Sequence, residues 1–210
     1  MFKYNLLVDI NYYHSTYTDF ILNTVVIAPQ DNVYGSDGTI NFAAASDILS
    51  GNVHAYQLYT NAPDKVSAQG ISFGLDYTLE KGYAIGGNLT WSSFNLQNAN
   101  PNNIAQFNTP EYSTNASFSN SNVFKGIGFD LAWHWQSAFE WYGTFNANIP
   151  GRINAYSLVD LQINKKLPKM HTTIKVGSSN LFNNKVYEAY GSPAIGAIYY
   201  VAFTFDDLLK

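Results

Sequence analysis

The sequence predicts an all-β protein, an antiparallel transmembrane β-barrel, and three observations support this prediction. Large apolar residues alternate with small or polar ones over segments of about ten residues, the length of a tilted strand that crosses a bilayer. The connectors between these segments are alternately short and long. Aromatic residues make up 16% of the 210 residues and charged residues only 12%, whereas about 25% charged is usual in a soluble domain.

The clearest strand is predicted for residues 70–79. Ile71, Phe73 and the following odd positions are large and apolar, whereas Gly70, Asp76 and the other even positions are small or polar. Strict alternation with a period of two places the two sets on opposite faces of a strand. The large apolar face suits lipid, and the small polar face suits a wet lumen.

The same alternation recurs along the rest of the chain. In residues 124–137, Trp133 and Trp135 alternate with His134 and Gln136. The pattern is equally clear at 155–164 and 197–206, and it is weaker at 3–13, 83–96, 111–120 and 171–181. We therefore expect about eight strands, an even number, as in bacterial outer-membrane barrels.

Connector length predicts the topology. The short connectors are 80–82, 121–123 and 167–169, and the long ones are 28–66, 97–110, 138–154 and 182–196. Because outer-membrane barrels have short periplasmic turns and long extracellular loops, we expect the first strand to run outward and the last to return to the periplasm. Aromatic residues toward the strand ends are expected to form the interfacial girdles: Tyr12, Tyr13, Trp91, Trp133, Trp135, Tyr199 and Tyr200.

Composition argues against several other classes. No apolar run reaches the roughly 18 residues of a transmembrane helix. The chain has no cysteine, which excludes disulfides and cysteine metal sites. A net charge of -4 gives no nucleic-acid footprint, and the presence of a single arginine, Arg152, further argues against a phosphate clamp. A soluble β-sandwich also alternates, but it would not usually keep an aromatic outer face or sort its connectors by length.

Motifs in the C-terminal third occur in a characteristic order. Val159-Asp160-Leu161 lies in one predicted strand, Asn180-Leu181-Phe182-Asn183 follows the next, and Tyr199 to Phe205 form an aromatic final strand. In this order and spacing they resemble the end of the β-barrel of TonB-dependent outer-membrane receptors. The resemblance is close over 107–205 and is mainly one of rhythm over 1–106. Two departures are Ala197, where many relatives have arginine, and the extension past Phe205.

The resemblance implies the rest of the architecture and the partners. Receptors of this family form a barrel of about 22 strands, filled by an N-terminal plug domain, and import iron-siderophores, cobalamin, sugars or similar scarce solutes. Residues 1–210 would then be a single partial barrel domain, about the last eight strands of the larger barrel, with the plug and the export signal upstream. The implied partners are outer-membrane lipid, the plug domain, TonB through the missing N-terminal part, and a small-molecule solute such as a metal chelate.

The chain offers no constellation for catalysis, a metal or a cofactor, so we expect no enzyme. The four histidines have no ligand spacing, and no Gly-x-Ser-x-Gly motif frames a serine. His134 and Asp130 share a face but would lie about 13 Å apart, too far for a hydrogen bond. The charged and polar residues expected on the lumen face, in contact with the plug, are Asp9, Asp76, Asp130, Asp160, Lys3, Lys175 and His134.

Solute recognition would fall to the extracellular loops and the upper wall of the lumen. The aromatic residues expected to act there as binding platforms are Tyr34, Tyr56, Tyr59, Trp141, Tyr142 and Tyr190. Two alternatives stay open at this point. One is a self-contained eight-stranded barrel that acts as an anchor or adhesin, although its many lumen-side Gly and Ser residues would fill it poorly. The other is a barrel lipid hydrolase.

Overall fold

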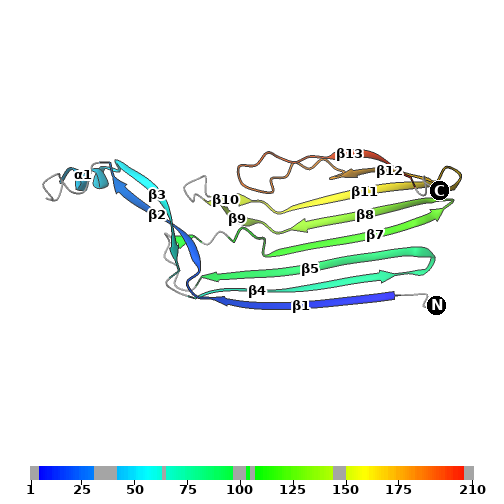
Figure 1. Ribbon diagram of the computed structural model, residues 1–210, viewed down its shortest axis with the longest axis horizontal. Helices are drawn as coiled ribbons and strands as arrows, with labels where there is room; N and C mark the ends of the chain where they lie inside the picture. Colours follow the sequence, from blue (N-terminus) through cyan, green and yellow to red (C-terminus); the bar gives the residue numbers. More distant parts are fainter. Residues whose placement is uncertain are drawn as a thin grey trace.

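The computed structural model describes residues 5–30, 42–62, 65–96, 103–104, 107–143 and 150–205, and its main element is one antiparallel sheet of eight strands. In sheet order the strands are β1 (Asn5–Tyr17), β4 (Val66–Thr78), β5 (Tyr83–Leu96), β7 (Tyr112–Phe124), β8 (Ile127–Gln136), β11 (Tyr156–Leu167), β12 (Thr172–Ser179) and β13 (Ile198–Phe205). Each strand pairs with the next one in this order, as a meander (Figure 1). The predicted set of eight strands is confirmed.

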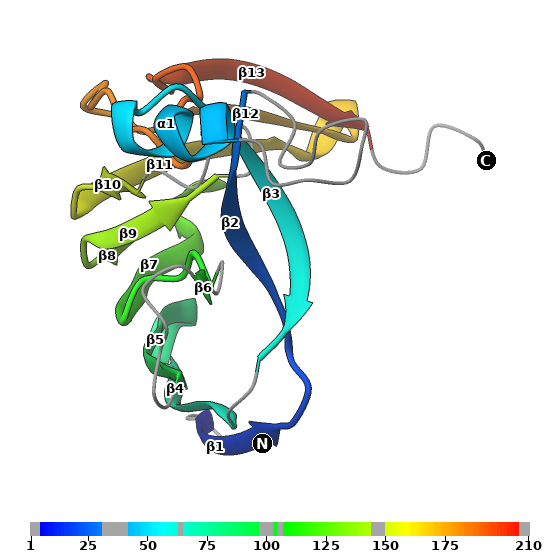
Figure 2. The same ribbon diagram turned by 90° about the vertical axis from the view of Figure 1, so that its left-hand side faces the viewer.

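The sheet is curved, as a segment of a barrel wall is. Seen along the strands, it forms an arc from β1 to β13 that is open on one side (Figure 2). Within the described residues β1 and β13 are the two edges of the sheet and do not pair with each other. A self-contained eight-stranded barrel would have to pair them, so the structure does not support that alternative.

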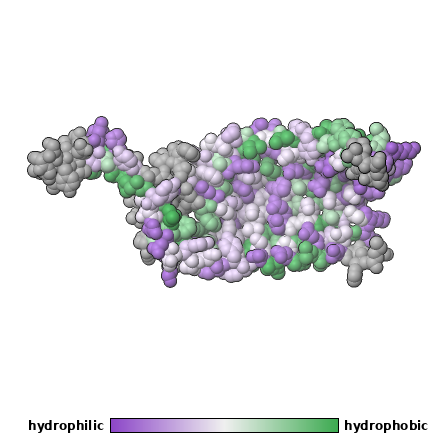
Figure 3. Space-filling model, in the orientation of Figure 1, coloured by the Kyte–Doolittle hydropathy of each residue, from purple (hydrophilic) through white to green (hydrophobic). Residues whose placement is uncertain are grey.

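The strand register sorts side chains between the two faces as the sequence predicts. Gly74 lies opposite both Asp9 and Asn88, and Asn88 lies opposite Asn115, so these small and polar residues share the concave face. Figure 3 looks onto this face and shows mainly hydrophilic and neutral residues across the strands. The predicted lumen residues Asp9, Asp76, Asp130, His134, Asp160 and Lys175 all lie on it by register, whereas Lys3 falls outside the described residues.

The convex face is apolar and uncovered. Ile10 is 67% exposed and Val201 is 61% exposed, and the other outward residues of these strands are similarly open. A soluble β-sandwich would bury this face against a second sheet. The compact apolar cluster is instead at the loop end of the sheet, where Leu22, Ala62 and Val66 pack together. An apolar face left uncovered in this way is typical of the outer wall of a transmembrane barrel.

Aromatic residues lie near the turn end of the convex face, and two of the residues predicted for the girdles lie on the other face. Near the short turns the Tyr83 and Phe118 rings stack with centroids 5.6 Å apart. Tyr13 and Tyr200 were expected in the girdles, but both face the lumen. They lie opposite Gly70 and Gly177 on that face of the sheet. A Cβ atom on Gly70 would lie 2.6 Å from the Tyr13 ring, and one on Gly177 would lie 2.5 Å from that of Tyr200. Because successive side chains of a strand point to opposite faces, only one residue of a neighbouring pair such as Tyr12-Tyr13 or Tyr199-Tyr200 can lie on the convex face.

The short connectors gather at one end of the sheet, where β1 begins and β13 ends (Figure 1). Two of them are 3₁₀ turns at Glu80–Gly82 and Pro168–Met170, close to their predicted positions. The third was placed wrongly at 121–123, because β7 continues to Phe124. The turn is made by Lys125 and Gly126, whose φ angles of 46° and 81° suit a tight two-residue hairpin.

The long connectors, expected as loops, contain regular structure of their own. β2 (Ile21–Pro29) and β3 (Val53–Asn61) form an antiparallel arm with helix α1 (Phe42–Ser50) at its tip. The short strand β6 (Asn103–Ile104) pairs with β2. The arm rises beyond the loop end of the sheet, from the β1 edge toward the level of β13 (Figures 1 and 2). None of the helices in the described part of the chain is long and apolar enough to span a membrane.

A second hairpin lies between β8 and β11. It consists of β9 (Phe139–Tyr142) and β10 (Pro150–Ile153), with Arg152 opposite Glu140. Asn108 fixes it to the preceding long connector, because its side chain accepts a hydrogen bond from the backbone N–H of Tyr142 and donates one to the carbonyl of the same residue, at 2.8 and 3.0 Å. This hairpin lies at the end of the sheet that carries the long connectors, which we call the mouth (Figure 1).

Candidate functional site

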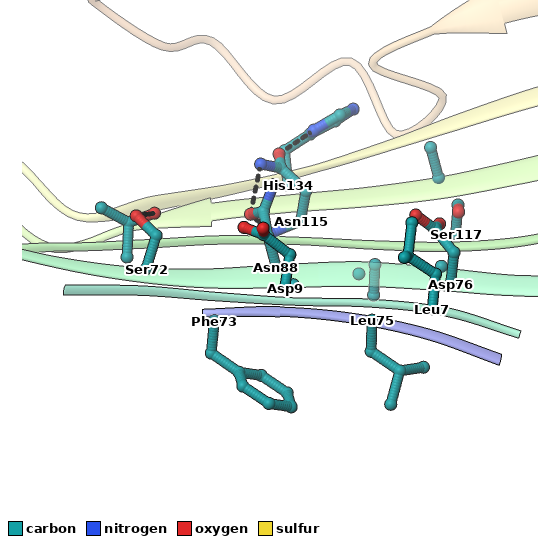
Figure 4. Close-up of a pocket in the computed structure, with 16 residues that line it drawn as sticks. Leu7, Asp9, Ser72, Phe73, Leu75, Asp76, Asn88, Asn115, Ser117 and His134 are labelled. Atoms are coloured by element: carbon teal, nitrogen blue, oxygen red, sulfur yellow. Dashed lines mark hydrogen bonds between the residues drawn. The ribbon is translucent and has the colours of Figure 1, made fainter. Parts of the chain in front are cut away.

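Several hollows in the described part of the chain are lined by polar side chains, and the first of them lies in the middle of the concave wall. It has a volume of about 440 Å³ and is lined by residues of β1, β4, β5, β7 and β8. Asp9, Asn88, Asn115 and His134 point into it, whereas Phe73 and Leu75 point to the opposite side of the sheet (Figure 4). The period-two alternation of the sequence is what places these polar groups together.

A chain of hydrogen bonds crosses the strands in this wall hollow. Asn115 Nδ2 donates to Asn88 Oδ1 at 3.0 Å, which turns the Asn115 Oδ1 atom toward His134 Nδ1, 2.5 Å away. His134 Nε2 lies 3.2 Å from Asp160 Oδ2 on β11. The partner of His134 is thus a residue of the neighbouring strand and not Asp130, as strand spacing predicts. Amides, a carboxylate and an imidazole in this arrangement offer polar contacts to whatever fills the lumen.

The same carboxylate also contacts the corner that follows β12. Asp160 Oδ1 accepts hydrogen bonds from the backbone N–H of Asn180, at 2.7 Å, and from Ser179 Oγ, at 3.3 Å. The Val-Asp-Leu and Asn-Leu-Phe-Asn motifs are separate in the sequence but are joined in the structure by the hydrogen bond between Asp160 and Asn180. Their joint occurrence has a direct physical reason.

The second hollow lies at the mouth, between β10, the start of β11 and the loop 180–197 that joins β12 to β13, called the mouth loop. It has a volume of about 490 Å³. Its side chains combine cations with phenol rings: Arg152, Tyr156, Lys185, Tyr187 and Tyr190. The loop is closed on itself by a bridge in which Val186 and Ile195 exchange backbone hydrogen bonds of 2.8 and 3.2 Å. The Tyr190 ring lies directly over Gly151, where any side chain would displace it.

The charge of this mouth hollow is available to a ligand. The Arg152 guanidinium lies 3.5 Å from Glu140, but the two side chains are 66% and 49% exposed. An ion pair this open contributes little, because water competes with it. A guanidinium can bind carboxylate or catecholate oxygens in pairs, and phenol rings can stack on a flat ligand. The hollow is therefore suited to an anion that carries aromatic groups.

The structure separates the predicted ligand-binding residues. Tyr190 lines the mouth hollow, and Trp141 and Tyr142 lie on the neighbouring β9. Tyr56 and Tyr59 lie on β3 of the arm, on opposite faces of that strand. Tyr34 falls outside the described residues.

Sequence reasoning missed four members of the mouth hollow: Arg152, Tyr156, Lys185 and Tyr187. One signal was present, since Arg152 is the single arginine and falls in a long connector. The scarcity of arginine argues against a phosphate clamp but leaves open what this one arginine binds. A lone cation in a predicted extracellular loop would have been a better guide to an anionic ligand.

Comparison with known proteins gives two kinds of match. A family model described as TonB dependent receptor-like, beta-barrel, matches residues 2–183. No curated protein matches the chain in sequence. Among solved structures, the siderophore receptor PirA from Acinetobacter baumannii is 18% identical with a TM-score of 0.58, and the match covers 94% of this chain and 29% of PirA.

Two further solved structures are similar to the chain. The ferric-catecholate import receptor Fiu from E. coli K12 is 12% identical with a TM-score of 0.60, covering 94% of this chain and 25% of Fiu. The pyoverdine outer membrane receptor FpvA from Pseudomonas aeruginosa is 17% identical with a TM-score of 0.61, covering 96% of this chain and 27% of FpvA. At these identities the likeness shows the fold. The chain spans less than a third of the length of each of these proteins.

Proposed function

Because the chain belongs to the TonB-dependent receptor β-barrel family, we propose that it supplies wall and mouth to a receptor that binds a scarce solute at the cell surface and imports it. Receptors of this family are located in the bacterial outer membrane, and the uncovered apolar face of the sheet fits that location. The family consists of receptors and transporters, not of enzymes. In this proposal residues 1–210 are one partial barrel domain, and the plug domain and the contact with TonB belong to the upstream part of the receptor.

The proposed solute is an anionic metal chelate with aromatic groups, such as a ferric siderophore. The observation that carries this proposal is the mouth hollow, where Arg152 and Lys185 stand beside Tyr156, Tyr187 and Tyr190. Cations neutralise the charge of a chelate, and the guanidinium can bind two of its oxygens at once. The names of the similar solved structures, a siderophore receptor and a ferric-catecholate import receptor, support the same class of solute.

The test uses ferric tris(catecholate), a trianionic aromatic chelate, and the full-length receptor that contains this chain. We expect Arg152→Ala to weaken binding about tenfold, because a hydrogen bond to a charged group contributes about 1.5 kcal/mol or more. Tyr190→Ala should weaken binding by a similar factor through the loss of its ring. Binding would be followed by quenching of the receptor's intrinsic fluorescence during titration.

Lys169→Ala is the matched control, because this lysine is exposed in the short turn at the opposite end of the sheet. It removes one positive charge and should leave binding unchanged. Equal losses in Arg152→Ala and Lys169→Ala would show that only overall charge matters. Unchanged binding in both Arg152→Ala and Tyr190→Ala would refute the mouth hollow as the solute site.

A further inference from the structure

The two oxygens of the Asp160 carboxylate serve different parts of the molecule. Oδ1 accepts hydrogen bonds from Asn180 and Ser179 at the end of β12, whereas Oδ2 faces His134 of the wall hollow on β8. Asp160 on β11 thus contacts both β8, its neighbour on one side in the sheet, and the corner that follows β12, its neighbour on the other side.

The corner that Asp160 holds is the root of the mouth loop. Asn180 is 3% exposed and has a φ of 53°, a left-handed conformation that asparagine tolerates. Its side chain donates to the Asn184 carbonyl at 2.7 Å and accepts from the Asn184 backbone N–H at 3.0 Å. Asn184 in turn donates to the carbonyl of Ser157 on β11, at 3.1 Å. The first residues of the loop are therefore fixed to β11 by side-chain hydrogen bonds.

The fixed root determines where the loop places its side chains. Lys185 follows Asn184 directly, and Tyr187 and Tyr190 come next along the same loop. All three line the mouth hollow, with Tyr156 of β11 on the other side. Asn183 also holds the returning leg of the loop, because its Oδ1 accepts from the backbone N–H of Ala197 at 3.0 Å.

We propose that Asp160 is a positioning residue for solute binding: its carboxylate fixes the root of the mouth loop, so that Lys185, Tyr187 and Tyr190 are held at the hollow. Asp160 does not line that hollow and acts through Asn180. The effect on solute binding rests on the function proposed above. The effect on the loop itself does not, and this difference allows the two to be tested separately.

Asparagine at position 160 is the conservative replacement. Its Oδ1 can accept from the Asn180 N–H as the carboxylate does, and its Nδ2 can donate to His134 Nε2. This is compatible with the wall hollow, because His134 can then carry its proton on Nδ1 and donate it to Asn115 Oδ1. Alanine leaves the buried Asn180 N–H without this acceptor, which is costly. The proposal therefore predicts loss in Asp160→Ala and rescue in Asp160→Asn.

The experiment measures loop mobility in the full-length receptor with a nitroxide spin label attached at Glu188→Cys. Position 188 is exposed in the mouth loop, and the chain has no cysteine of its own. We expect Asp160→Ala to convert an immobile spectrum to a mobile one and to weaken ferric tris(catecholate) binding about tenfold. Asp160→Asn should resemble the unsubstituted receptor in both measurements. Resistance of the barrel to heat in detergent would show that each variant is folded.

Asp130→Ala is the matched control, since Asp130 is a carboxylate on β8 that lies, like Asp160 on β11, on the concave face. It should change neither the spectrum nor binding. An immobile label in folded Asp160→Ala, or equal mobility in Asp130→Ala, would overturn the proposal. A mobile label in Asp160→Ala together with unchanged chelate binding in Arg152→Ala and Tyr190→Ala would support the fixed loop root and refute the mouth hollow as the solute site.

Discussion

Leu131→Lys is expected to destabilise the folded receptor by about 2–4 kcal/mol, the cost of a lysine at the middle of the lipid face of a barrel. Leu131 lies at the centre of β8, and its neighbours across the strands are Phe118 on β7 and Leu161 on β11. All three residues are on the convex face, which is apolar and uncovered. A charge placed there loses its hydration and finds no partner within reach.

Ala132→Lys is the control for this prediction. It introduces the same side chain one residue further along β8, but on the concave face, where Ala132 lines the wall hollow. Lumen charges remain solvated, so we expect less than half of the cost. The free energy of unfolding in lipid bilayers, from denaturant titrations of the full-length receptor, would measure both. Equal costs would contradict the assignment of the two faces.

Gly128→Ala is expected to destabilise the β7–β8 hairpin by about 1–3 kcal/mol, the usual cost of overpacking. A Cβ atom at this position would lie 2.5 Å from the Asn120 carbonyl oxygen and from backbone atoms of Ser121. The strand register is irregular between Asn120 and Phe124, as in a bulge that brings one backbone close to another. Only glycine fits beneath this bulge.

The backbone opposite Gly128 cannot easily move away. Asn120 is almost fully buried, and its side chain donates to the Lys81 carbonyl at 3.0 Å and accepts from the Asn122 N–H at 2.7 Å. Asn122 Oδ1 accepts from the N–H of Gly126 at 2.8 Å. These contacts tie the bulge to two of the short turns. The strain of an added methyl group must therefore stay local.

Gly74→Ala provides the matched comparison. A Cβ atom there would lie 3.7 Å from Asp9 Cβ, an ordinary van der Waals distance, so we expect a change below about 0.5 kcal/mol. Both substitutions add one methyl group to a strand glycine on the concave face. Unfolding free energies of the two variants, measured as for Leu131→Lys, should differ clearly. A similar cost for both would show that the bulge yields to the methyl group.

The mouth and the wall differ in how far sequence could predict them. The six proposed aromatic platforms, Tyr34, Tyr56, Tyr59, Trp141, Tyr142 and Tyr190, were selected because long connectors carry recognition in barrels. That choice remains a proposal for all of them. Tyr190 lies in the hollow that also holds Arg152 and Lys185, whereas Tyr56 and Tyr59 lie on the arm. Connector length indicates which end of a barrel binds, but not which loops meet there.

By itself the sequence determined the number of wall strands, the face that each side chain occupies and the end of the sheet that carries the long loops. These properties follow from local alternation and from connector length, so neighbouring residues suffice to predict them. The turn at Lys125 and Gly126 was misplaced because the bulge before it interrupts the alternation. The prediction of Tyr13 and Tyr200 as girdle residues is wrong, because the alternation along β1 and β13 places both side chains on the concave face although they lie near strand ends.

Only the tertiary structure decided which side chains meet. Asp160 and Asn180 are 20 residues apart in the sequence, and Arg152 reaches the mouth hollow beside Lys185 only because β10, β11 and the loop after β12 converge. Such contacts depend on the register between strands and on the paths of long connectors. Both are set by hydrogen bonds and packing between distant segments, which no local pattern in the sequence encodes.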